Sequence, residues 1–285
     1  MILRLRTREE LARWRARLAP GAALGFVPTM GALHAGHQSL VVAARRECDA
    51  VLASVFVNPL QFDQRDDFER YPRTEDADCE LLHASGADAV YLPAAADVYR
   101  PGAAARVLPG PAGADFEGRL RPGHFAGVLT VVLKLLQRAR PHRAYFGEKD
   151  AQQLFLVREL VADLDVPVAI RPCPTVREAD GLALSSRNAR LDAAARAQAP
   201  VLFRALRAAV ALYAAGERRP PALEHGMRTV YAAAGIIPDY AAVVDDATFL
   251  APQDGAGADA GAWRAITAAR IGGTRLLDNL ALAAC

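Results

Sequence analysis

The stretch FVPTMGALHAGHQSLVVAAR, residues 26–45, decides the fold class of this chain. Its apolar start fits the end of a short buried strand, Gly31 and Gly36 mark a turn, and the apolar positions from Leu40 onward follow helical spacing. A helix that begins near His37 offers its first backbone N–H groups and the positive end of its dipole to an anion. The stretch is therefore expected to open a βαβ unit with a phosphate-binding turn.

The same pattern continues outward from this stretch. Between about residue 24 and residue 173, short apolar runs alternate with segments of helical period, which is typical of stacked βαβ units around a mostly parallel sheet. Expected strands cover residues 24–28, 51–58, 89–92, 143–146 and 168–171, and expected helices cover residues 38–48, 75–85, 125–139 and 151–164. The predicted fold class is α/β, a Rossmann-like doubly wound parallel sheet.

Beyond Arg187 the pattern of the sequence changes. Two long helical segments, separated by Pro220 and Pro221, replace the alternation. Three later segments read as antiparallel strands, and the stretch PQDGAGADAG reads as a flexible connection between two of them. The strands are expected at residues 240–244, 263–271 and 274–279. We therefore expect two domains, residues 1–175 and a smaller α+β domain of residues 176–285.

The composition is that of a folded protein without a strong charge. The chain has 285 residues, of which 52% are hydrophobic and 23% charged, and its formal net charge is +2. A charge this small creates no field that attracts nucleic acid or an anionic membrane surface. No apolar run is long enough to span a bilayer. We expect neither a nucleic-acid partner nor a membrane association.

The cysteines and the N-terminus favour a cytoplasmic protein. The cysteines form no CxxC pair and no metal-ligand spacing, so reduced thiols are expected rather than disulfides or a structural zinc. They are Cys48, Cys79, Cys173 and Cys285. The first residues lack the apolar stretch and cleavage site of a secretory signal, and Thr7 with Glu10 fits a capping box that opens an ordinary helix.

Two histidines lie in the first turn. His34 and His37 are three residues apart, and imidazoles placed there can donate hydrogen bonds to phosphate oxygens as charge develops. Histidines in a turn are also common as surface residues or as the start of a metal site. Their position after a strand favours the phosphate role.

Amides follow the second expected strand. Asn58 and Gln61 supply neutral hydrogen-bonding groups that suit a small polar substrate. A simple turn at Asn58-Pro59 explains the same residues equally well. Because ligands of open α/β sheets bind at the carboxyl ends of the strands, these amides and the histidine turn are expected to converge.

Lys149 follows the fourth expected strand and is one of only two lysines in the chain, the other being Lys134. A compact ammonium in a strand-to-helix turn can follow phosphate oxygens. Pairing with Glu148 or Asp150 is the alternative.

Two further loops carry basic and hydroxyl groups. Ser185, Ser186 and Arg187 suit a triphosphate, although the same residues make an adequate helix N-cap. Arg121 lies before another expected helix, where a plain basic loop is the simpler interpretation.

The motifs PTMGALHAGH, FVNPLQF, RPGHFAGV, YFGEKDAQQ and LALSSRN, in this order, resemble those of the pantothenate synthetase (pantoate–β-alanine ligase) family. The resemblance covers about residues 24–190 by motif, and the remainder matches in length and texture. HxGH alone would indicate only the wider nucleotidyltransferase superfamily, which includes class I aminoacyl-tRNA synthetases. FVNPLQF and FGEKDAQQ narrow the resemblance.

The resemblance implies a two-step reaction. The carboxylate of (R)-pantoate attacks the α-phosphorus of ATP to give pantoyl-adenylate and pyrophosphate, and the amine of β-alanine then displaces AMP to form pantothenate. It also implies that Mg²⁺ accompanies ATP, that the second domain closes over the ATP site, and that the protein is a homodimer.

The resemblance also assigns roles by position. His37 matches the proton donor, His34 the neighbouring phosphate contact, and Lys149 and Arg187 the stabilisers of charge. ATP-binding positions are Met30, Gly31, Ala32, Leu33, His34, Ala35, Gly36, His37, Gly147, Glu148, Lys149, Asp150, Val176, Leu184, Ser185, Ser186 and Arg187. Substrate positions are Gln61, Gln153, Asn58 and Arg121. Leu184 stands where the family often has Met, an apolar exchange that would reshape the adenine pocket slightly.

Two other functions fit parts of this pattern. One is a nucleotidyltransferase that adenylates a phosphate acceptor and leaves a stable anhydride as product. The other is a non-catalytic ATP sensor, which has no need of Gln61 and Gln153 beside a phosphate turn.

Overall fold

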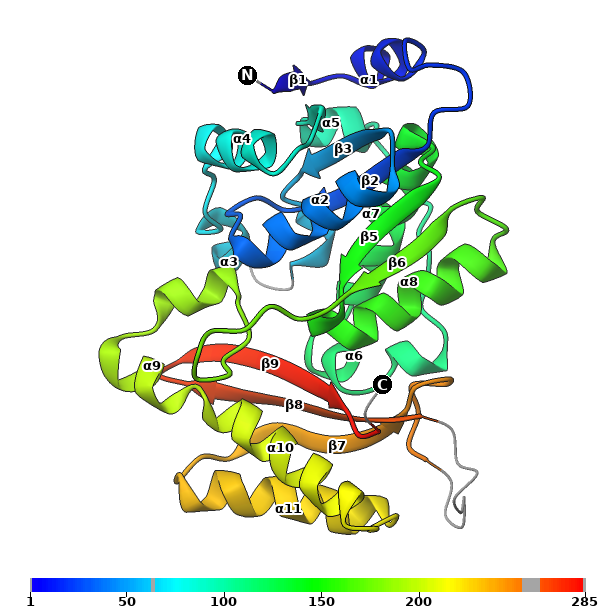
Figure 1. Cartoon of the computed structure of the whole chain (residues 1–285). Helices are drawn as coiled ribbons and strands as arrows, with labels where there is room; N and C mark the ends of the chain where they lie inside the picture. The colour runs from blue at the N-terminus through cyan, green and yellow to red at the C-terminus, as the bar shows by residue number, and fades with distance from the viewer. Residues whose placement is uncertain (1, 63–64, 253–261, 284–285) are drawn as a thin grey trace. The chain divides into compact units, whose positions relative to one another are not determined.

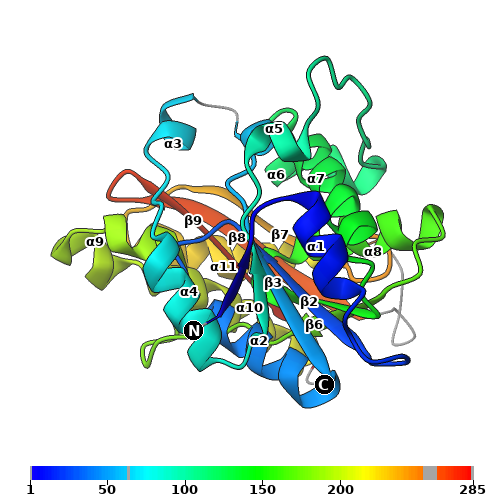
Figure 2. The same ribbon diagram turned by 90° about the horizontal axis from the view of Figure 1, so that it is seen from above.

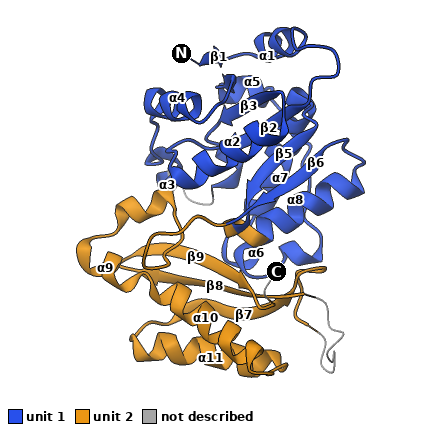
Figure 3. Cartoon of the chain, viewed as in Figure 1, with its two compact units in different colours: residues 1–148, 152–174 blue, residues 149–151, 175–285 orange. Residues whose placement is uncertain are grey.

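The computed structural model describes residues 2–62, 65–252 and 262–283 and divides the chain into two compact units (Figure 3). Unit 1 comprises Met1–Glu148 and Gln152–Pro174, and unit 2 comprises Lys149–Ala151 and Thr175–Cys285. Lys149 thus belongs to the second unit, although it follows a strand of the first in sequence.

Unit 1 is built on a parallel sheet of six strands in the order β1-β4-β3-β2-β5-β6 (Figure 1). The strands are β1 (Leu3–Leu5), β2 (Leu24–Thr29), β3 (Ala50–Val55), β4 (Ala89–Tyr91), β5 (Arg143–Gly147) and β6 (Ala169–Cys173). The central strands are almost wholly buried, as expected when helices cover both faces of a parallel sheet. The predicted α/β class is confirmed.

The connections of unit 1 run over both faces of the sheet. The helices are α1 (Arg8–Arg15), α2 (Ala35–Glu47), η1 (Pro59–Gln61), α3 (Arg65–Glu69), α4 (Glu75–Ala84), α5 (Ala95–Val98), η2 (Pro111–Gly113), α6 (Glu117–Leu120), α7 (His124–Ala139), η3 (Glu148–Asp150) and α8 (Ala151–Asp163). Val27, Val51 and Ala53 form one core with Leu40 and Val41 of α2. The long helix α7 contacts β2 and packs beside α1 (Figure 2).

The chain order creates a switch point between β2 and β5. From β2 the chain passes through α2 to β3 on one side, and from β5 it passes through α8 to β6 on the other side. Because parallel crossovers are right-handed, α2 and α8 must cover opposite faces. The carboxyl ends of β2 and β5 therefore lie side by side beneath a crevice of the kind that binds ligands in α/β sheets.

The structure corrects several expected boundaries. Strand β1 was not predicted. It pairs in parallel with β4 and forms one edge of the sheet. Helix α2 begins at Ala35 rather than at residue 38, and β3 ends at Val55 because the following Asn58 caps the 3-10 turn η1. The capping box of Thr7 and Glu10 is confirmed at the start of α1.

Unit 2 is a three-stranded antiparallel sheet in the order β7-β8-β9, accompanied by helices. Its elements are η4 (Ser186–Arg190), α9 (Ala193–Gln198), α10 (Val201–Ala214), α11 (Pro220–Ala233), β7 (Pro238–Asp245), β8 (Trp263–Ile271) and β9 (Thr274–Ala281). Its core joins Leu202, Leu206, Met227 and Tyr231 of the helices to Trp263 of the sheet. Pro200 divides the expected long helix, since α9 ends before it and α10 begins after it. Most of PQDGAGADAG lies outside the described residues.

The cysteines agree with the expected reduced state where the structure describes them. Cys48, Cys79 and Cys173 are buried and free, and burial raises the pKa of the Cys173 thiol to about 11. Cys285 lies outside the described residues.

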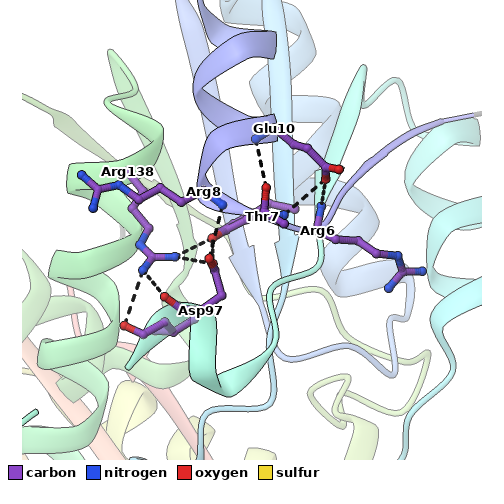
Figure 4. Close-up of polar contacts among 8 residues, drawn as sticks. Arg6, Thr7, Arg8, Glu10, Asp97 and Arg138 are labelled. Carbon is purple, nitrogen blue, oxygen red and sulfur yellow. Dashed lines mark hydrogen bonds and ion pairs between the residues drawn. The ribbon is translucent and has the colours of Figure 1, made fainter. Parts of the chain in front are cut away.

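A largely buried ion pair ties the N-terminal segment to the helices behind the sheet (Figure 4). The side chains of Arg138 on α7 and Asp97 on α5 are only 12% and 21% exposed, and Arg138 Nη1 lies 2.6 Å from Asp97 Oδ2. Tyr91 donates to the same carboxylate at 2.5 Å, and the Arg8 backbone N–H donates to its other oxygen. Burial alone would raise the pKa of Asp97, but hydrogen bonds from Tyr91 and Arg138 outweigh it and hold the pKa below its ordinary 3.8.

We predict that Asp97→Asn lowers the free energy of unfolding at pH 7 by about 3 kcal/mol, because Arg138 keeps its charge in a buried site without a counter-charge. A carboxyl with a depressed pKa stabilises the fold above its unfolded value and loses this contribution as the pH falls through the folded value. The difference between wild type and variant should therefore narrow below pH 3.8. Urea unfolding of both proteins from pH 7 to below pH 3.8 measures this difference in the free energy of unfolding.

Asp76→Asn is the matched control, because it removes a carboxylate that is 84% exposed from its pair with Arg4. Its effect should stay below about 1 kcal/mol. Equal losses in the two variants would contradict the structural role of the buried pair.

Candidate functional site

The turn after β2 occupies one side of the switch point. Gly31 and Ala32 both have left-handed backbones, with φ of 85° and 51°. A Cβ at residue 31 would lie 2.9 Å from Asp78 Oδ2, so both the backbone angle and the space require glycine there. Ala32 adopts the same left-handed backbone conformation although it is not glycine. Such strained conformations are typical of functional sites.

Asp78 of α4 fixes the shape of this turn. Its side chain is 3% exposed and accepts the backbone N–H groups of Ala32 at 3.1 Å and Leu33 at 2.8 Å. The Thr74 hydroxyl donates to the same carboxylate at 3.1 Å. A buried carboxylate is stable when it accepts several hydrogen bonds, and here these bonds hold the strained turn in place.

His34 and His37 cap the helix that follows the turn. His34 is the N-cap of α2, and its Nδ1 accepts the Gly36 N–H at 3.1 Å. The Nδ1 of His37 accepts the His34 N–H at 3.3 Å, and the two ring centroids are 4.2 Å apart. Since each Nδ1 acts as an acceptor, each neutral ring must carry its proton on Nε2. The backbone thereby fixes both imidazoles as Nε2 donors at the positive end of the helix dipole.

Gln61 joins this turn to a second polar cluster. Its side chain is 8% exposed, and Nε2 lies 2.9 Å from the Met30 sulfur. The Asn58 side-chain amide donates to Gln61 Oε1 at 3.0 Å and to the Gly127 carbonyl at 3.1 Å. The structure therefore brings Met30, Asn58 and Gln61 together, as the sequence predicted for the first two strand ends.

The side-chain oxygen of Asn58 is held by two further hydrogen bonds. Its Oδ1 accepts the Leu60 N–H at 3.3 Å and the Tyr99 hydroxyl at 2.7 Å. Burial raises the pKa of Tyr99 to about 12, so this hydroxyl stays protonated and donates at neutral pH. Helix α7 comes so close that a Cβ at Gly127 would lie 2.1 Å from the Leu60 carbonyl oxygen. Close packing thus sets the position of Gln61.

Arg121 and His124 complete this cluster from the start of α7. The His124 ring lies 2.9 Å by Nδ1 from the Gln61 backbone oxygen, and Arg121 Nη1 lies 3.1 Å from His124 Nε2. Because a guanidinium only donates, His124 Nε2 must accept and Nδ1 must carry the proton. Arg121 is thus part of the Gln61 cluster rather than of a plain basic loop.

The two glutamines at the start of α8 differ in their contacts. Gln152 is buried and binds the segment that precedes α7. It accepts the Glu117 N–H and donates to the carbonyls of Ala112 and Asp115. Gln153, which the resemblance assigns to pantoate, is half-buried.

Unit 2 contains a small pocket that is open to solvent. Its lining includes Lys149, Ser185, Arg187 and Asn188 and residues of β9 such as Arg275. The ammonium of Lys149 lies 3.6 Å from Asp150, so the alternative pairing considered for it is present. In the part of the chain that the structure describes, Arg187 has no carboxylate partner, and its charge can serve an anion.

The remaining positions of unit 2 that were predicted to bind ATP are connected to one another. The Val176 carbonyl accepts the Leu184 N–H at 2.9 Å, and Ser185 Oγ accepts the Arg187 N–H at 3.2 Å. The N-cap interpretation of Ser185 is therefore correct for η4. A hydroxyl that caps a turn can still lie at the edge of a binding pocket, as Ser185 does.

Asp78 and Tyr99 belong to these clusters but were not predicted from the sequence. Asp78 and Tyr99 lie in segments without any motif, and their roles depend on contacts with residues 46 and 41 positions away. The only signal for Asp78 in the sequence was its position, because it stands on the side of a helix that faces the core. An aspartate is rarely buried there without partners.

A doubly wound sheet with a histidine-capped helix at its switch point is the architecture of an α/β nucleotide-binding protein. Comparison with known proteins narrows this class. The family model described as pantoate-beta-alanine ligase matches residues 4–281. The chain therefore belongs to the pantoate–β-alanine ligase family.

Individual relatives agree over almost the whole chain. The pantothenate synthetase of Acidothermus cellulolyticus is 52% identical over 265 residues, which are 93% of this chain and 87% of the relative. That of Gluconobacter oxydans is 48% identical over 278 residues, covering 96% of this chain and 98% of the relative.

Solved structures agree as well. The pantothenate synthetase of Thermus thermophilus matches with a TM-score of 0.91 and 44% identity, covering 99% of this chain and 100% of its own. The pantoate-beta-alanine ligase of Francisella tularensis, which was complexed with "Beta-gamma ATP" and β-alanine, matches with a TM-score of 0.80 and 33% identity, covering 99% and 98%.

Two negative observations apply to the described residues. Across residues 2–62, 65–252 and 262–283, no helix has the length and apolar character needed to cross a membrane. Within the same ranges, no three His, Cys, Asp or Glu side chains are grouped so that they could hold a metal ion.

We predict that Asp78→Ala weakens ATP binding by about tenfold or more, because two backbone N–H groups lose their acceptor and the strained turn relaxes, at about 1–3 kcal/mol per unsatisfied group. Equilibrium binding of ATP measures the loss. Glu80→Ala, an exposed carboxylate on the same helix, is the control and should bind ATP as the wild type does. Wild-type affinity in Asp78→Ala would show that the carboxylate does not shape the turn.

Proposed function

We propose that this chain condenses (R)-pantoate with β-alanine at the expense of ATP, through a pantoyl-adenylate intermediate. Membership of the pantoate–β-alanine ligase family supports the overall reaction. In the first step a pantoate carboxylate oxygen bonds to the α-phosphorus and the bond to pyrophosphate breaks. In the second step the β-alanine nitrogen bonds to the acyl carbon and AMP leaves.

One contact carries the proposal, the 2.9 Å approach of Gln61 Nε2 to the Met30 sulfur. It connects a turn suited to phosphate with an amide suited to a small acid, within a single unit. An ATP sensor would need the turn but not the buried Gln61 cluster. In-line attack at phosphorus depends mainly on positioning and on charge neutralisation, and these two groups supply positioning.

The proposed roles of the histidines follow from their tautomers. Both rings present an Nε2–H, which can donate to phosphate oxygens without prior protonation. We assign His37 to the adenylation transition state and His34 to holding phosphate. Charge that develops on the phosphates is stabilised best by donors that are already oriented before the reaction.

The other predicted positions are divided between the units. In unit 2, Lys149 and Arg187 are proposed to neutralise the phosphates, and residues 176 and 184–187 to bind the nucleotide. In unit 1, Gln61 and Gln153 are proposed to bind substrate. Leu184, in place of the Met common in the family, is proposed to alter only the apolar contact with adenine.

Asn58 and Arg121 are proposed to act on Gln61 rather than on substrate alone. The polar atoms of Asn58 bind Gln61, Gly127, Leu60 and Tyr99, which makes this residue a positioning group. Arg121 reaches Gln61 through His124 and by a 3.4 Å contact with the Gln61 carbonyl.

We propose that Mg²⁺ enters bound to ATP. This ion usually keeps several waters and is held by one or two carboxylates together with substrate phosphates. A protein without a preformed cage among its described residues suits that mode of binding. The ion would neutralise phosphate charge. The homodimer, the cytoplasmic location and the closure of the second domain over the ATP site stay predictions of the sequence.

We expect purified protein to exchange labelled pyrophosphate into ATP only when pantoate is present, because adenylation is reversible before β-alanine arrives. Omitting pantoate and replacing it with another hydroxy acid are the controls. Exchange without any acid would contradict acyl activation. A product that keeps the nucleotide joined to its acceptor, instead of free AMP, would favour the alternative nucleotidyltransferase.

We predict that His37→Ala lowers kcat by about 100-fold or more while ATP affinity changes much less, because an oriented donor is lost mainly from the transition state. Turnover and ATP binding are measured on the same preparation. His34→Asn keeps an N-cap acceptor and should mainly weaken ATP binding, and the exposed His225→Ala serves as control. Equal losses of turnover and affinity in His37→Ala would indicate that this residue only binds.

A further inference from the structure

Lys149 belongs to unit 2, and one side chain on β9 of that unit bonds to its backbone. Asn279, which is 4% exposed, donates from Nδ2 to the Lys149 carbonyl oxygen at 2.9 Å. No sequence motif includes Asn279, which stands 130 residues further along the chain. This contact fastens the backbone of the predicted phosphate-binding lysine to the edge strand of the small sheet.

The contact requires a side chain that both accepts and donates a hydrogen bond, as an amide does. Arg264 Nη1 donates to Asn279 Oδ1 at 2.6 Å, and a guanidinium cannot accept. The Lys149 carbonyl, on the other side, can only accept. A residue placed between them must therefore accept from one partner and donate to the other, which asparagine does and aspartate cannot.

Asn279 is itself held rigidly. Arg264 makes a two-pronged ion pair with Asp246 at 2.6 and 3.1 Å. The neighbouring Asp278, 3% exposed, binds Arg177 by two hydrogen bonds of 2.6 and 2.9 Å and accepts the Asn279 N–H at 2.8 Å. Bidentate arginine–carboxylate pairs are the most geometrically specific of the charged contacts. These two pairs fix the strand position from which Asn279 reaches Lys149.

We infer that Asn279 is a positioning residue that holds Lys149 in the same pocket as Arg187. Both cations line the pocket, together with residues of β9. Arg177 also fixes the loop that leads to Arg187, by donating to the Gly181 carbonyl at 3.0 Å. The inference rests on the proposed role of Lys149 in neutralising phosphate. The small sheet thus serves as the common support for two charges that are 38 residues apart in sequence.

The kinetic test is a double-mutant cycle of Asn279→Asp with Lys149→Met. Aspartate keeps the acceptor for Arg264 and loses the donor to Lys149. Because the bond to Arg264 remains, the fold should be retained. Displacing a charge-stabilising group by a fraction of an ångström to an ångström costs about 10- to 100-fold in turnover. Asn279→Asp should lower kcat by about tenfold in the wild-type background and by less than about twofold in the Lys149→Met background.

A second measurement does not depend on activity. The chain has only two lysines, so the rates at which an amine-reactive acylating reagent modifies Lys149 and Lys134 can be compared within one molecule by mass spectrometry. Asn279→Ala, which introduces no charge, should raise the Lys149 to Lys134 ratio by at least about threefold, because the released segment opens more often.

Tyr231→Phe is the matched control. It removes a buried hydrogen bond of 2.8 Å to Thr267 in the same unit and touches neither Lys149 nor Asn279. It should leave unchanged both kcat in the two lysine backgrounds and the Lys149 to Lys134 acylation ratio. The inference is overturned by an unchanged ratio in Asn279→Ala or by the same kcat loss in both lysine backgrounds. If the wild type has no ligase activity, the acylation ratio alone decides, which separates failure of the inference from failure of the proposed function.

Discussion

The pairing of β2 with β5 is the constraint on which the rest of unit 1 depends. Their onward connections leave toward opposite faces, so neither crossover helix covers the ends of these two strands. The turn at residues 30–34 must fit this position, and the short distance from strand to helix forces Gly31 and Ala32 into left-handed conformations. Asp78 stabilises that geometry by accepting two backbone N–H groups. Topology places the turn, and one buried carboxylate keeps it in shape.

The histidines and the amides also combine structural and chemical roles. His34 and His37 cap helix α2, and capping fixes the tautomer that each ring presents to a ligand. Gln61 is likewise oriented by Asn58, which is oriented in turn by Tyr99. A buried polar network of this kind is stable only when its members are satisfied, and it then specifies one arrangement.

Unit 2 holds two of the cationic residues that the sequence predicted to bind phosphate. Lys149 follows β5 in sequence but is bound to β9, and Arg187 lies in the same pocket. Two ion pairs, Arg177 with Asp278 and Arg264 with Asp246, stabilise the strand that carries this arrangement. Both are partly or fully buried, so they resist screening by salt better than exposed pairs. The cations of the proposed site therefore depend on the packing of the small sheet.

The sequence by itself determined the alternation of strands and helices, the change of architecture after β6, and the family, since each depends on local periodicity or on contiguous motifs. It placed residues 30–37, Gln61 and Lys149 at strand ends correctly. It did not determine β1, whose three residues are stabilised only by pairing with β4. Nor could it identify Asp78, Tyr99 or Asn279, because their partners are 41 to 130 residues away and no local pattern records such a contact. Tertiary structure alone decided which polar residues are satisfied by one another, since hydrogen bonds depend on distances that close only when the chain has folded.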